Sequence, residues 1–313
     1  MTVGVFDGVH LGHQHLINHL ASLAGTQRGT QITPVIVTFK NHPLTILKPD
    51  ISLAFLTTLS DRLGLLHQTG IENVLPITFS RDLSLMSAEE FITILIDTVG
   101  MTSLIVGPDF AMGRDRLGTG PLLNRLGEQQ GFSVHVIPPF SLEGRPVNST
   151  KIREALSHGN VDLAKRLLGR RYKVGGVIER GEGRGKTLGF PTANITHPTD
   201  LALPADGIYA ANISINHSIH AAAVSIGSKP TFHSNSPRTT EAYILDFDGD
   251  LYGYYADIEF VDQIRPQKEF PSADALVTEM EQDILKVRST LTPAPNSAHV
   301  PAGHLENDGG FHG

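Results

Sequence analysis

The pattern of apolar residues changes near the middle of the chain, and this change constrains the fold more than any other feature. Up to about residue 170, short apolar runs alternate with segments of helical spacing. From 172 to 261 the runs are short and are separated by Gly, Asn, Asp and Pro. Strand–helix alternation predicts a parallel sheet covered by helices on both faces, whereas closely spaced short strands predict an antiparallel barrel or sandwich. We therefore expect two domains, which suits a length of 313 residues.

The periodicity places the individual elements. In the first half the predicted strands are Val3–Phe6, Ile32–Phe39, Asn73–Ile77, Ser103–Val106 and Ser133–Ile137. The predicted helices between them are Gln14–Ala24, Leu56–Thr69, Ala88–Val99 (capped by Ser87 with Glu90) and Gly120–Gln130. In the second half we predict strands over Tyr172–Glu179, Gly207–Ile215, Ala221–Ile226, Thr240–Leu245 and Tyr252–Phe260, then a helix over Ser272–Thr290. One helix over Lys151–Leu168 is expected to bridge the halves.

These elements define the expected domain limits. They are an α/β domain over 1–155, a connecting helix over 156–170, a β domain over 171–291 and a tail over 292–313. The tail is rich in Pro, Gly, His and Asn and has no periodicity, so we expect it to be disordered.

Composition excludes several classes of protein. No run of eighteen apolar residues occurs and the first residues resemble no secretory signal, so we expect no membrane association and a cytoplasmic protein. The chain has no cysteine, which excludes disulfides and thiolate metal sites. Its formal net charge of −7 argues against a nucleic-acid partner.

The first motif with chemical meaning is G-V-F-D-G-V-H-L-G-H, from Gly4 to His13. It joins a predicted strand to a predicted helix, and glycines in such a turn let the backbone approach a phosphate. His10 and His13 are three residues apart at the start of the helix, so they lie on one side near its positive end. A lone H-x-x-H would equally suggest zinc or a surface pair. The full string in this position favours nucleotidyl transfer, in which the imidazoles donate hydrogen bonds to phosphate oxygens.

Two further strings of the first half support this interpretation. Asn148-Ser149-Thr150-Lys151-Ile152-Arg153 places hydroxyls and cations at a helix start, where they could hold phosphates. By itself this string would be a helix cap provided by Ser149 or Thr150. Asp109 follows the strand Ser103–Val106, at the carboxyl edge where open parallel sheets bind ligands.

The second motif is G-E-G-R-G-K-T-L-G-F-P-T-A-N, from Gly181 to Asn194. Its end fits G-x-x-x-x-G-K-[ST], but Arg180 stands where that pattern begins with glycine and no helix pattern follows, which argues against a P-loop NTPase. We interpret the glycines as a flap over phosphates. Thr192 and Asn194 alternate in extended geometry, so both face one site, and their oxygens suit Mg²⁺. A Gly-Pro turn before a strand is the structural alternative.

Glu241 begins the predicted strand Thr240–Leu245, on the same face as Tyr243. A carboxylate on a rigid strand could accept a proton from a substrate hydroxyl, although most such glutamates are only solvated.

Together these strings resemble the bifunctional prokaryotic riboflavin kinase/FMN adenylyltransferase family, also called FAD synthetases. The resemblance runs from Thr2 to about Leu291. Besides the motifs above it includes Phe39-x-x-His42-Pro43, Leu168-Gly169-Arg170-x-Tyr172, Lys229-Pro230-Thr231-Phe232 and Asp250-Leu251-Tyr252-Gly253. It implies an N-terminal nucleotidyltransferase domain with a Rossmann-like parallel sheet and a C-terminal antiparallel riboflavin kinase barrel with a terminal helix.

The resemblance also implies roles for individual residues. In the adenylyltransferase domain, catalysis falls to His10 and His13, and ATP or phosphate binding to Gly4, Phe6, Gly8, Gly12, Asp109, Ser149, Thr150 and Arg153. In the kinase domain Glu241 is the base, and ATP or flavin binding falls to Gly181, Gly185, Lys186, Gly189, Pro191, Thr192, Asn194, Arg265 and Phe270. Thr192 and Asn194 are also the expected ligands of Mg²⁺. ATP is the co-substrate, riboflavin and FMN are substrates, and FMN and FAD are products; a homo-oligomer stays open.

The sequence departs from the family pattern in three places. Only Met1–Val3 precede Gly4, Met112 stands where an aromatic is usual, and Asn148 replaces a small hydroxyl residue. These departures leave open a riboflavin kinase with an impaired adenylyltransferase domain. A flavin-sensing regulator is a third hypothesis, and the retained histidines, Thr192, Asn194 and Glu241 argue against it.

Overall fold

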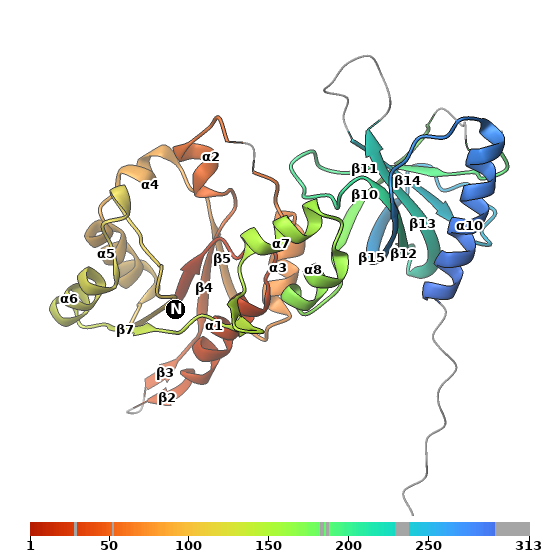
Figure 1. The fold of residues 1–313 in the computed structure, drawn as a ribbon. Helices are drawn as coiled ribbons and strands as arrows, with labels where there is room; N and C mark the ends of the chain where they lie inside the picture. Colours follow the sequence, from red (N-terminus) through yellow and green to blue (C-terminus); the bar gives the residue numbers. More distant parts are fainter. Residues whose placement is uncertain (28–29, 52, 182–184, 186–187, 229–237, 292–313) are drawn as a thin grey trace, which may run out of the picture.

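The first half of the chain forms a parallel sheet, seen in the computed structural model (Figure 1). The structure describes residues 1–27, 30–51, 53–181, 185, 188–228 and 238–291. Strands pair in parallel in the order β5-β4-β1, with bounds β1 Thr2–Gly4, β4 Val35–Phe39 and β5 Asn73–Ile77. A second parallel pair is formed by β6 (Ser103–Val106) and β7 (Ser133–Val136).

Met1 joins these two groups of strands. Its amine donates a hydrogen bond to the Ser103 carbonyl at 2.6 Å, and the Ile105 amide donates to the Met1 carbonyl at 2.9 Å. Strand β6 therefore lies beside β1, on the side away from β4. The order of strands reverses at β1, and the carboxyl edge at such a reversal is where open α/β sheets bind ligands.

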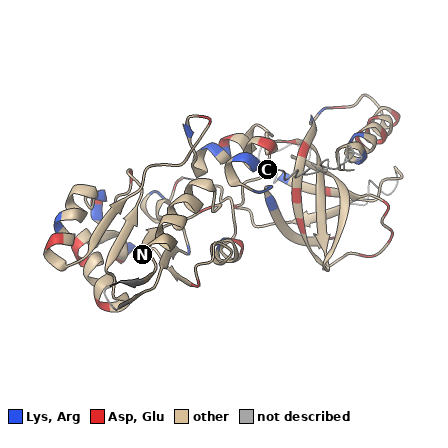
Figure 2. Cartoon of the chain, turned by 90° about the horizontal axis from the view of Figure 1, so that it is seen from below, with Lys and Arg blue, Asp and Glu red and all other residues tan. Residues whose placement is uncertain are grey.

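Helices cover both faces of this sheet, as the sequence predicts. They are α1 (Leu11–Ser22), α3 (Leu59–His67), α5 (Ala88–Val99) and α6 (Gly120–Gln130). On β4, Ile36 packs with Ile17, Leu20 and Leu66 of α1 and α3, whereas its neighbour Val37 packs in the cluster of α5 and α6. Consecutive strand residues point to opposite faces, so two separate apolar cores form. Charged residues lie along the outer helices of both domains (Figure 2).

Several predicted bounds agree with the structure, and others do not. Asn73–Ile77, Ala88–Val99, Ser103–Val106 and Gly120–Gln130 are confirmed. Ser87 Oγ accepts from the Glu90 amide at 3.1 Å and Glu90 Oε2 accepts from the Ser87 amide at 2.7 Å, which confirms the capping box. The single strand Ile32–Phe39 is wrong, because β3 (Thr30–Ile32) ends before Pro34 and pairs with β2 (Gly25–Gln27). The first strand ends at Gly4, and the first and second helices begin at Leu11 and Leu59. Short unpredicted elements are α2 Pro43–Leu47, α4 Arg81–Leu85, η1 Arg114–Arg116, β8 Ser141–Leu142 and β9 Arg145–Pro146.

The predicted bridging helix is wrong, since it is two helices, α7 (Ser149–Ser157) and α8 (Val161–Leu168). Gly159 separates them with φ of +73°, and the Asn160 side chain caps α8 by accepting from the Leu163 amide at 2.9 Å. Both helices share one apolar core with the second half of the chain, in which Ile152, Leu156 and Leu168 belong to the same cluster as Ile213 and Phe260.

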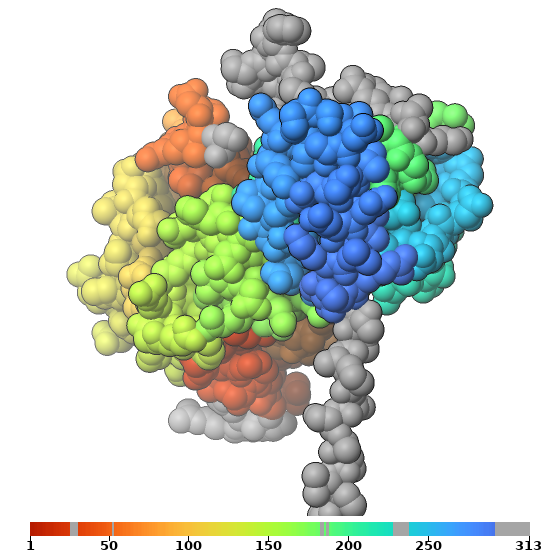
Figure 3. Space-filling model, turned by 45° about the vertical axis from the view of Figure 1, so that its right-hand side comes forward, coloured from red at the N-terminus to blue at the C-terminus, as the bar shows by residue number. Residues whose placement is uncertain are grey.

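The second half forms the predicted antiparallel barrel, closed in the order β10-β11-β14-β13-β12-β15. The strands are β10 Lys173–Glu179, β11 Ala193–Thr196, β12 Gly207–Ile215, β13 Ser218–Ser228, β14 Arg238–Ile244 and β15 Tyr255–Pro266. Helix α10 (Ala273–Leu291) lies across the outside of the barrel, where it contacts β12, β13 and β15 (Figures 1 and 3). The predicted disordered tail, 292–313, is outside the described residues. Among those residues, no helix has the length and apolar character that crossing a membrane requires.

The break between α7 and α8 generates a stability prediction. Gly159→Ala puts a Cβ in the left-handed region and about 2.5 Å from the Gln263 side chain, so we expect a loss of about 1–2 kcal/mol in the free energy of unfolding. The matched control is Gly64→Ala, whose Cβ meets nothing within 4 Å inside α3 and should be neutral or stabilising. Denaturant unfolding of both variants measures the difference. Equal stability of the two would contradict the conclusion that the break between α7 and α8 requires glycine at position 159.

Candidate functional sites

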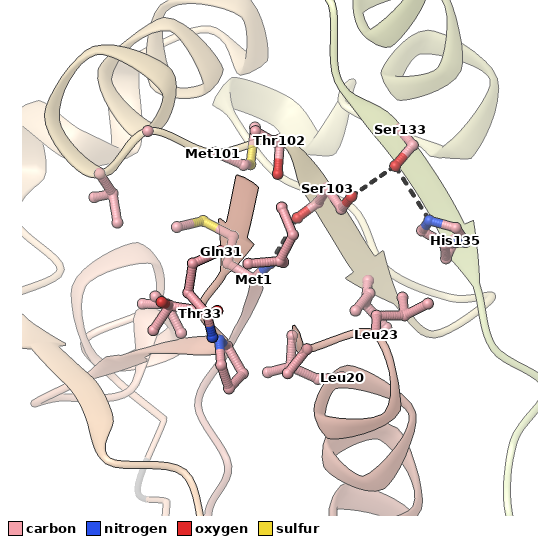
Figure 4. Close-up of a pocket in the computed structure, with 17 residues that line it drawn as sticks. Met1, Leu20, Leu23, Gln31, Thr33, Met101, Thr102, Ser103, Ser133 and His135 are labelled. Atoms are coloured by element: carbon pink, nitrogen blue, oxygen red, sulfur yellow. Dashed lines mark hydrogen bonds between the residues drawn. The ribbon is translucent and has the colours of Figure 1, made fainter. Parts of the chain in front are cut away.

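One pocket of the α/β domain lies at the wrong edge of the sheet for catalysis (Figure 4). It is lined by Met1, Val35, Ser103 and Ser133, which lie at the starts of parallel strands. Ser133 Oγ lies 2.8 Å from Ser103 Oγ and 3.1 Å from His135 Nε2, so these polar groups contact one another. Ligands of open parallel sheets bind at the carboxyl edge, so the candidate site lies at the opposite edge.

At that edge, the loop between β1 and α1 is a turn with several left-handed residues. Phe6, Gly8 and Val9 have φ of +54°, +82° and +39°. A Cβ on Gly8 would lie 2.8 Å from Leu56 Cδ1, so this position requires glycine for space as well as for conformation. Gly12 is as confined, because a Cβ there would lie 2.7 Å from the Val147 carbonyl. Gly4 is the last residue of β1. The motif thus folds back sharply at the reversal of the sheet.

His10 and His13 lie together at the start of α1, as predicted. Their rings stack with centroids 3.6 Å apart and planes at 16°. His10 is the N-cap, and its Nδ1 accepts a hydrogen bond from the His13 amide at 3.2 Å. An accepting Nδ1 has no proton, so the neutral His10 ring carries its hydrogen on Nε2, where it is a donor.

The environment keeps both imidazoles neutral. Burial, followed by the charges of Arg170 and Arg153, lowers the pKa of His10 to about 3. Burial, followed by the charges of His10 and Arg62, holds the pKa of His13 well below its ordinary value. The positive charge around this motif therefore comes from guanidinium groups, and the histidines contribute hydrogen-bonding groups.

Asp7, inside the same motif, is a buried carboxylate with several donors. It accepts from the Leu56 amide at 3.0 Å, from the Thr57 amide at 3.2 Å and from the Thr57 hydroxyl at 3.1 Å. Arg153 of α7 forms an ion pair with it, and Ser149 Oγ donates to its backbone carbonyl at 3.0 Å. The network brings the motif and the start of α7 together.

The cap of α7 differs from the prediction. Asn148 Oδ1 accepts from the Lys151 amide at 3.0 Å, so Asn148 is the N-cap. The expectation that Ser149 or Thr150 caps the helix is wrong, because Ser149 turns toward Asp7 and Thr150 is exposed. A helix cap is a role that asparagine fills as well as serine. The other internal departure, Met112, is buried and pairs through its backbone with Gly118.

Sequence analysis assigned no individual role to three residues in or beside the motif: Asp7, His42 and Arg62. His42 caps α2 through Nδ1, and burial, then the Arg153 charge, lower its pKa. Arg62 is buried and donates to the Val5 carbonyl at 2.8 Å and the Lys40 carbonyl at 3.3 Å. The signals for Asp7 and His42 were their places in the motif and directly before Pro43. Arg62 has no local signal, because only tertiary packing places this residue of α3 against the carbonyls of Val5 and Lys40.

Asp109 lies on the other side of the strand reversal, just after β6. It is exposed, and Arg116 donates to its carbonyl at 3.3 Å. It lines a surface pocket together with Phe110 and the start of α6. The structure does not bring its carboxylate into contact with His10 or His13.

In the barrel domain, the described glycines of the second motif lie beside the start of β11. The Phe190 amide donates to the Gly185 carbonyl at 2.8 Å, and a Cβ on Gly185 would lie 3.2 Å from Thr192 Oγ1. A Cβ on Gly181 would overlap the Asn194 amide. Gly189 has φ of +90° in this turn, ahead of Pro191. Lys186 and the Lys229–Phe232 string lie outside the described residues.

Barrel closure brings Thr192, Asn194 and Glu241 together. Asn194 is the direct register partner of Glu241 between β11 and β14. Thr192 Oγ1 donates to Glu241 Oε2 at 3.3 Å. A hydroxyl, an amide and a carboxylate from distant parts of the sequence therefore meet on the outer face of the barrel.

Two pockets meet at Thr192. One lies between the barrel and α10 and is lined by Glu241, Tyr243, Phe270, Met280 and Ile284. The other is lined by Pro191, Asp248, Asp250 and Tyr252, and the guanidinium of Arg180 lies over the Tyr252 ring at 4.6 Å. The first has apolar and aromatic walls suited to a flat ring system, whereas the second adjoins the glycine motif.

Arg265 fixes α10 to the barrel beside the first pocket. It forms a double hydrogen bond with Asp283, with Nε to Oδ1 at 3.0 Å and Nη2 to Oδ2 at 2.7 Å. Glu279 lies 3.4 Å away, and the guanidinium is 5.5 Å from the Phe270 ring centroid. The side chains of Arg265 and Asp283 are only 12% and 4% exposed, so this pair is buried.

The donor set at Thr192 and Asn194 fits Mg²⁺ better than a soft metal. Mg²⁺ prefers oxygen ligands and commonly binds through few protein groups together with substrate phosphates. Among the described residues, no group of three or more His, Cys, Asp or Glu could hold a metal ion.

Comparisons with known proteins cover both domains. The sequence model of the FAD synthetase family matches residues 1–151, and that of the riboflavin kinase family matches 168–291. A bifunctional riboflavin kinase/FMN adenylyltransferase from Pseudomonas fluorescens is 34% identical over 299 residues, covering 95% of this chain and 94% of its own. The protein of the same description from Escherichia coli K12 is 32% identical over 290 residues, covering 92% and 91%. A crystal structure described as a macrolide-efflux protein from Streptococcus pneumoniae is 30% identical, with a TM-score of 0.82 and coverage of 92% and 93%.

The depressed histidine pKa values predict how stability depends on pH. Because the pKa of His10 falls from 6.5 to about 3 on folding, the unfolded chain binds the extra proton between these values. The stability that neutral His10 contributes is complete above about pH 6.5. As the pH falls, the free energy of unfolding decreases by about 1.4 kcal/mol per pH unit. Unfolding measured between about pH 7 and 5 should therefore show a shallower pH dependence for His10→Gln. His67→Gln, which removes an exposed imidazole, controls for the substitution, and unchanged slopes for His10→Gln would contradict the prediction.

The buried pair on α10 predicts a second effect. Asp283→Ala leaves Arg265 without its main partner and should cost about 3 kcal/mol of stability. Asp246→Ala removes one ion-pair partner of Arg288, which lies on α10. Both side chains of that pair are well exposed, so stability should change little. Thermal unfolding compares the two variants. Similar losses of stability would show that burial does not make the Arg265–Asp283 pair more important than the exposed pair.

Proposed function

This chain belongs to the bifunctional riboflavin kinase/FMN adenylyltransferase family, and from that premise we propose how its two sites divide the work. The barrel site transfers the γ-phosphoryl group of ATP to riboflavin and makes FMN. The α/β site joins FMN to the adenylyl group of a second ATP, making FAD and releasing pyrophosphate. The observation that carries the kinase assignment is the Thr192–Glu241 contact between two adjoining pockets.

In the kinase reaction, the isoalloxazine ring of riboflavin occupies the pocket between the barrel and α10. The apolar and aromatic side chains of Tyr243, Phe270 and Met280 support this placement. ATP occupies the pocket beside the glycine motif, so that its terminal phosphate points toward Thr192. Glu241 accepts the proton of the ribityl 5′-hydroxyl as that oxygen attacks the γ-phosphorus and ADP leaves. Positioning and charge neutralisation provide most of the rate in such transfers.

Thr192 and Asn194 are the residues that would hold Mg²⁺ with the ATP phosphates. The ion supplies neutralisation of the phosphate charge when bound. Before substrates bind, the Thr192 hydroxyl donates to Glu241. This contact orients the carboxylate toward the junction of the two pockets.

In the adenylyl transfer, the FMN phosphate attacks the α-phosphorus of ATP and pyrophosphate leaves. The nucleophile is already an anion, so the reaction needs no general base. The neutral His10 donates from Nε2 to phosphate oxygens, which its accepting Nδ1 supports. Arg153 and the positive end of α1 stabilise the charge that develops on the leaving group. Asp109, in the surface pocket just after β6, contributes to ATP binding from the other side of the strand reversal.

Matches to both domains favour the two-step enzyme over the alternatives. A kinase with an impaired adenylyltransferase domain is less supported, because Asn148 serves as a helix cap and Met112 is packed in the core. A flavin-sensing regulator would not require the neutral histidine pair or the Thr192–Glu241 contact.

Reciprocal variants test the assignment. Glu241→Gln should lower FMN formation from riboflavin, ATP and Mg²⁺ by about 10²–10⁴-fold, because the hydroxyl loses its base, and should leave FMN-to-FAD conversion intact. His10→Ala should lower FAD formation by about 10²–10³-fold and spare the kinase. The control is Glu259→Gln, a barrel glutamate that pairs with Arg171. Chromatography resolves the flavins; loss of both reactions in either folded variant would refute separate sites.

A further inference from the structure

Arg170 reaches from the start of the barrel domain into the adenylyl-transfer motif. It lies two residues after α8 and within the part of the chain that matches the riboflavin kinase family. Its Nη2 donates to the Gly8 carbonyl at 2.8 Å, and its Nη1 donates to the Val9 carbonyl at 3.5 Å. The FAD synthetase match ends at residue 151. A residue assigned to one domain thus contacts the catalytic loop of the other.

The turn that Arg170 contacts has a strained backbone. Val9 has φ of +39°, a conformation that β-branched residues rarely adopt. Such strain costs of order 1–3 kcal/mol and persists only where the surroundings impose it. Val9 immediately precedes His10, so the direction of the Val9 peptide determines where the His10 ring points.

A second contact links this turn to the end of α8 through Gln14 of α1. Gln14 Nε2 donates to the Val9 carbonyl at 2.9 Å and lies 3.2 Å from the Leu168 carbonyl, so it links the turn to α8. A Cβ on Gly169 would lie 2.6 Å from Leu11 Cδ2, so the close approach that admits Arg170 requires glycine before it. The contact between Arg170 and the turn therefore depends on the packing of α1 against the end of α8.

The next residue provides a natural comparison. Arg171 has the same charge, but its guanidinium pairs with Glu259 on β15 at 3.0 Å. The carbonyls of Gly8 and Val9 accept from Arg170, and a charged donor binds a carbonyl about twice as strongly as a neutral one. Arg170 is also one of the charges that surround His10.

We propose that Arg170 is a positioning residue for adenylyl transfer: it holds the Gly8–Val9 turn so that His10 and His13 face the ATP phosphates. This inference rests on the proposed function of the α/β site and deepens it. The adenylyl-transfer site is then completed by the segment that leads into the kinase barrel, and Arg170 acts through the loop without contacting the nucleotide.

The test uses Arg170→Gln, Arg170→Lys and Arg171→Gln in the full chain. For each, the FMN-to-FAD and riboflavin-to-FMN reactions are measured in the same preparation, together with the unfolding temperature. Arg170→Gln should lower kcat of FAD formation by about 10–100-fold, the equivalent of losing hydrogen bonds from a charged donor, with little change in KM for ATP. Arg170→Lys keeps one charged donor and should restore part of kcat. Arg171→Gln should behave as wild type.

The other possible outcomes each support or overturn the proposal. Wild-type kcat in Arg170→Gln would overturn the proposal, and so would an increase in KM for ATP at unchanged kcat, which would indicate direct binding of the nucleotide. Equal loss of both reactions with a lower unfolding temperature would reduce Arg170 to a structural role. If Arg170→Gln does not fold, Arg170→Lys decides: kcat of FAD formation below wild type with an intact kinase reaction supports the proposal, and wild-type kcat overturns it. Absence of FAD formation in the unmodified protein would instead refute the proposed function.

Discussion

A single buried carboxylate, that of Asp7, organises the α/β site and its connection to the barrel. A carboxylate removed from water is stable only when its oxygens are fully hydrogen-bonded. Asp7 meets this demand with the amides of Leu56 and Thr57, the Thr57 hydroxyl and Arg153. The Leu56 segment in turn touches the barrel, because the Phe55 amide donates to the Asp200 carbonyl at 2.6 Å and the Ala202 amide donates to the Phe55 carbonyl at 2.7 Å. One ionised group therefore ties together three distant segments.

This arrangement separates charge from hydrogen bonding around the histidine pair. Burial, together with the guanidinium groups around the motif, keeps His10 and His13 uncharged. A neutral imidazole with a defined tautomer, as in His10, can direct hydrogen bonds without attracting ligand charge indiscriminately. A turn that contains Val9 in a left-handed conformation positions the histidine pair, which fits the general tendency of strained backbone to occur at functional sites.

The barrel site depends on a different constraint, the closure of a sheet. Thr192 and Glu241 meet because β11 pairs with β14, and α10 then closes the neighbouring pocket through the buried Arg265–Asp283 pair. The segment between the domains is more than a linker. Helices α7 and α8 contribute Ile152 and Leu168 to the core of the barrel, and the loop after α8 contacts the Gly8–Val9 turn of the α/β domain.

The sequence alone determined the fold class, the two motifs and most regular elements, because periodicity and capping are local signals. Ala88–Val99 was predictable from its apolar face and its Ser87–Glu90 cap. The single helix over Lys151–Leu168 failed because Gly159 interrupts a pattern that otherwise continues across it. Only the tertiary structure decided that Asp7 is buried, that Asn194 faces Glu241 and that Arg170 reaches Gly8. Those contacts join residues far apart in the chain, and their geometry arises from packing, which no local pattern encodes.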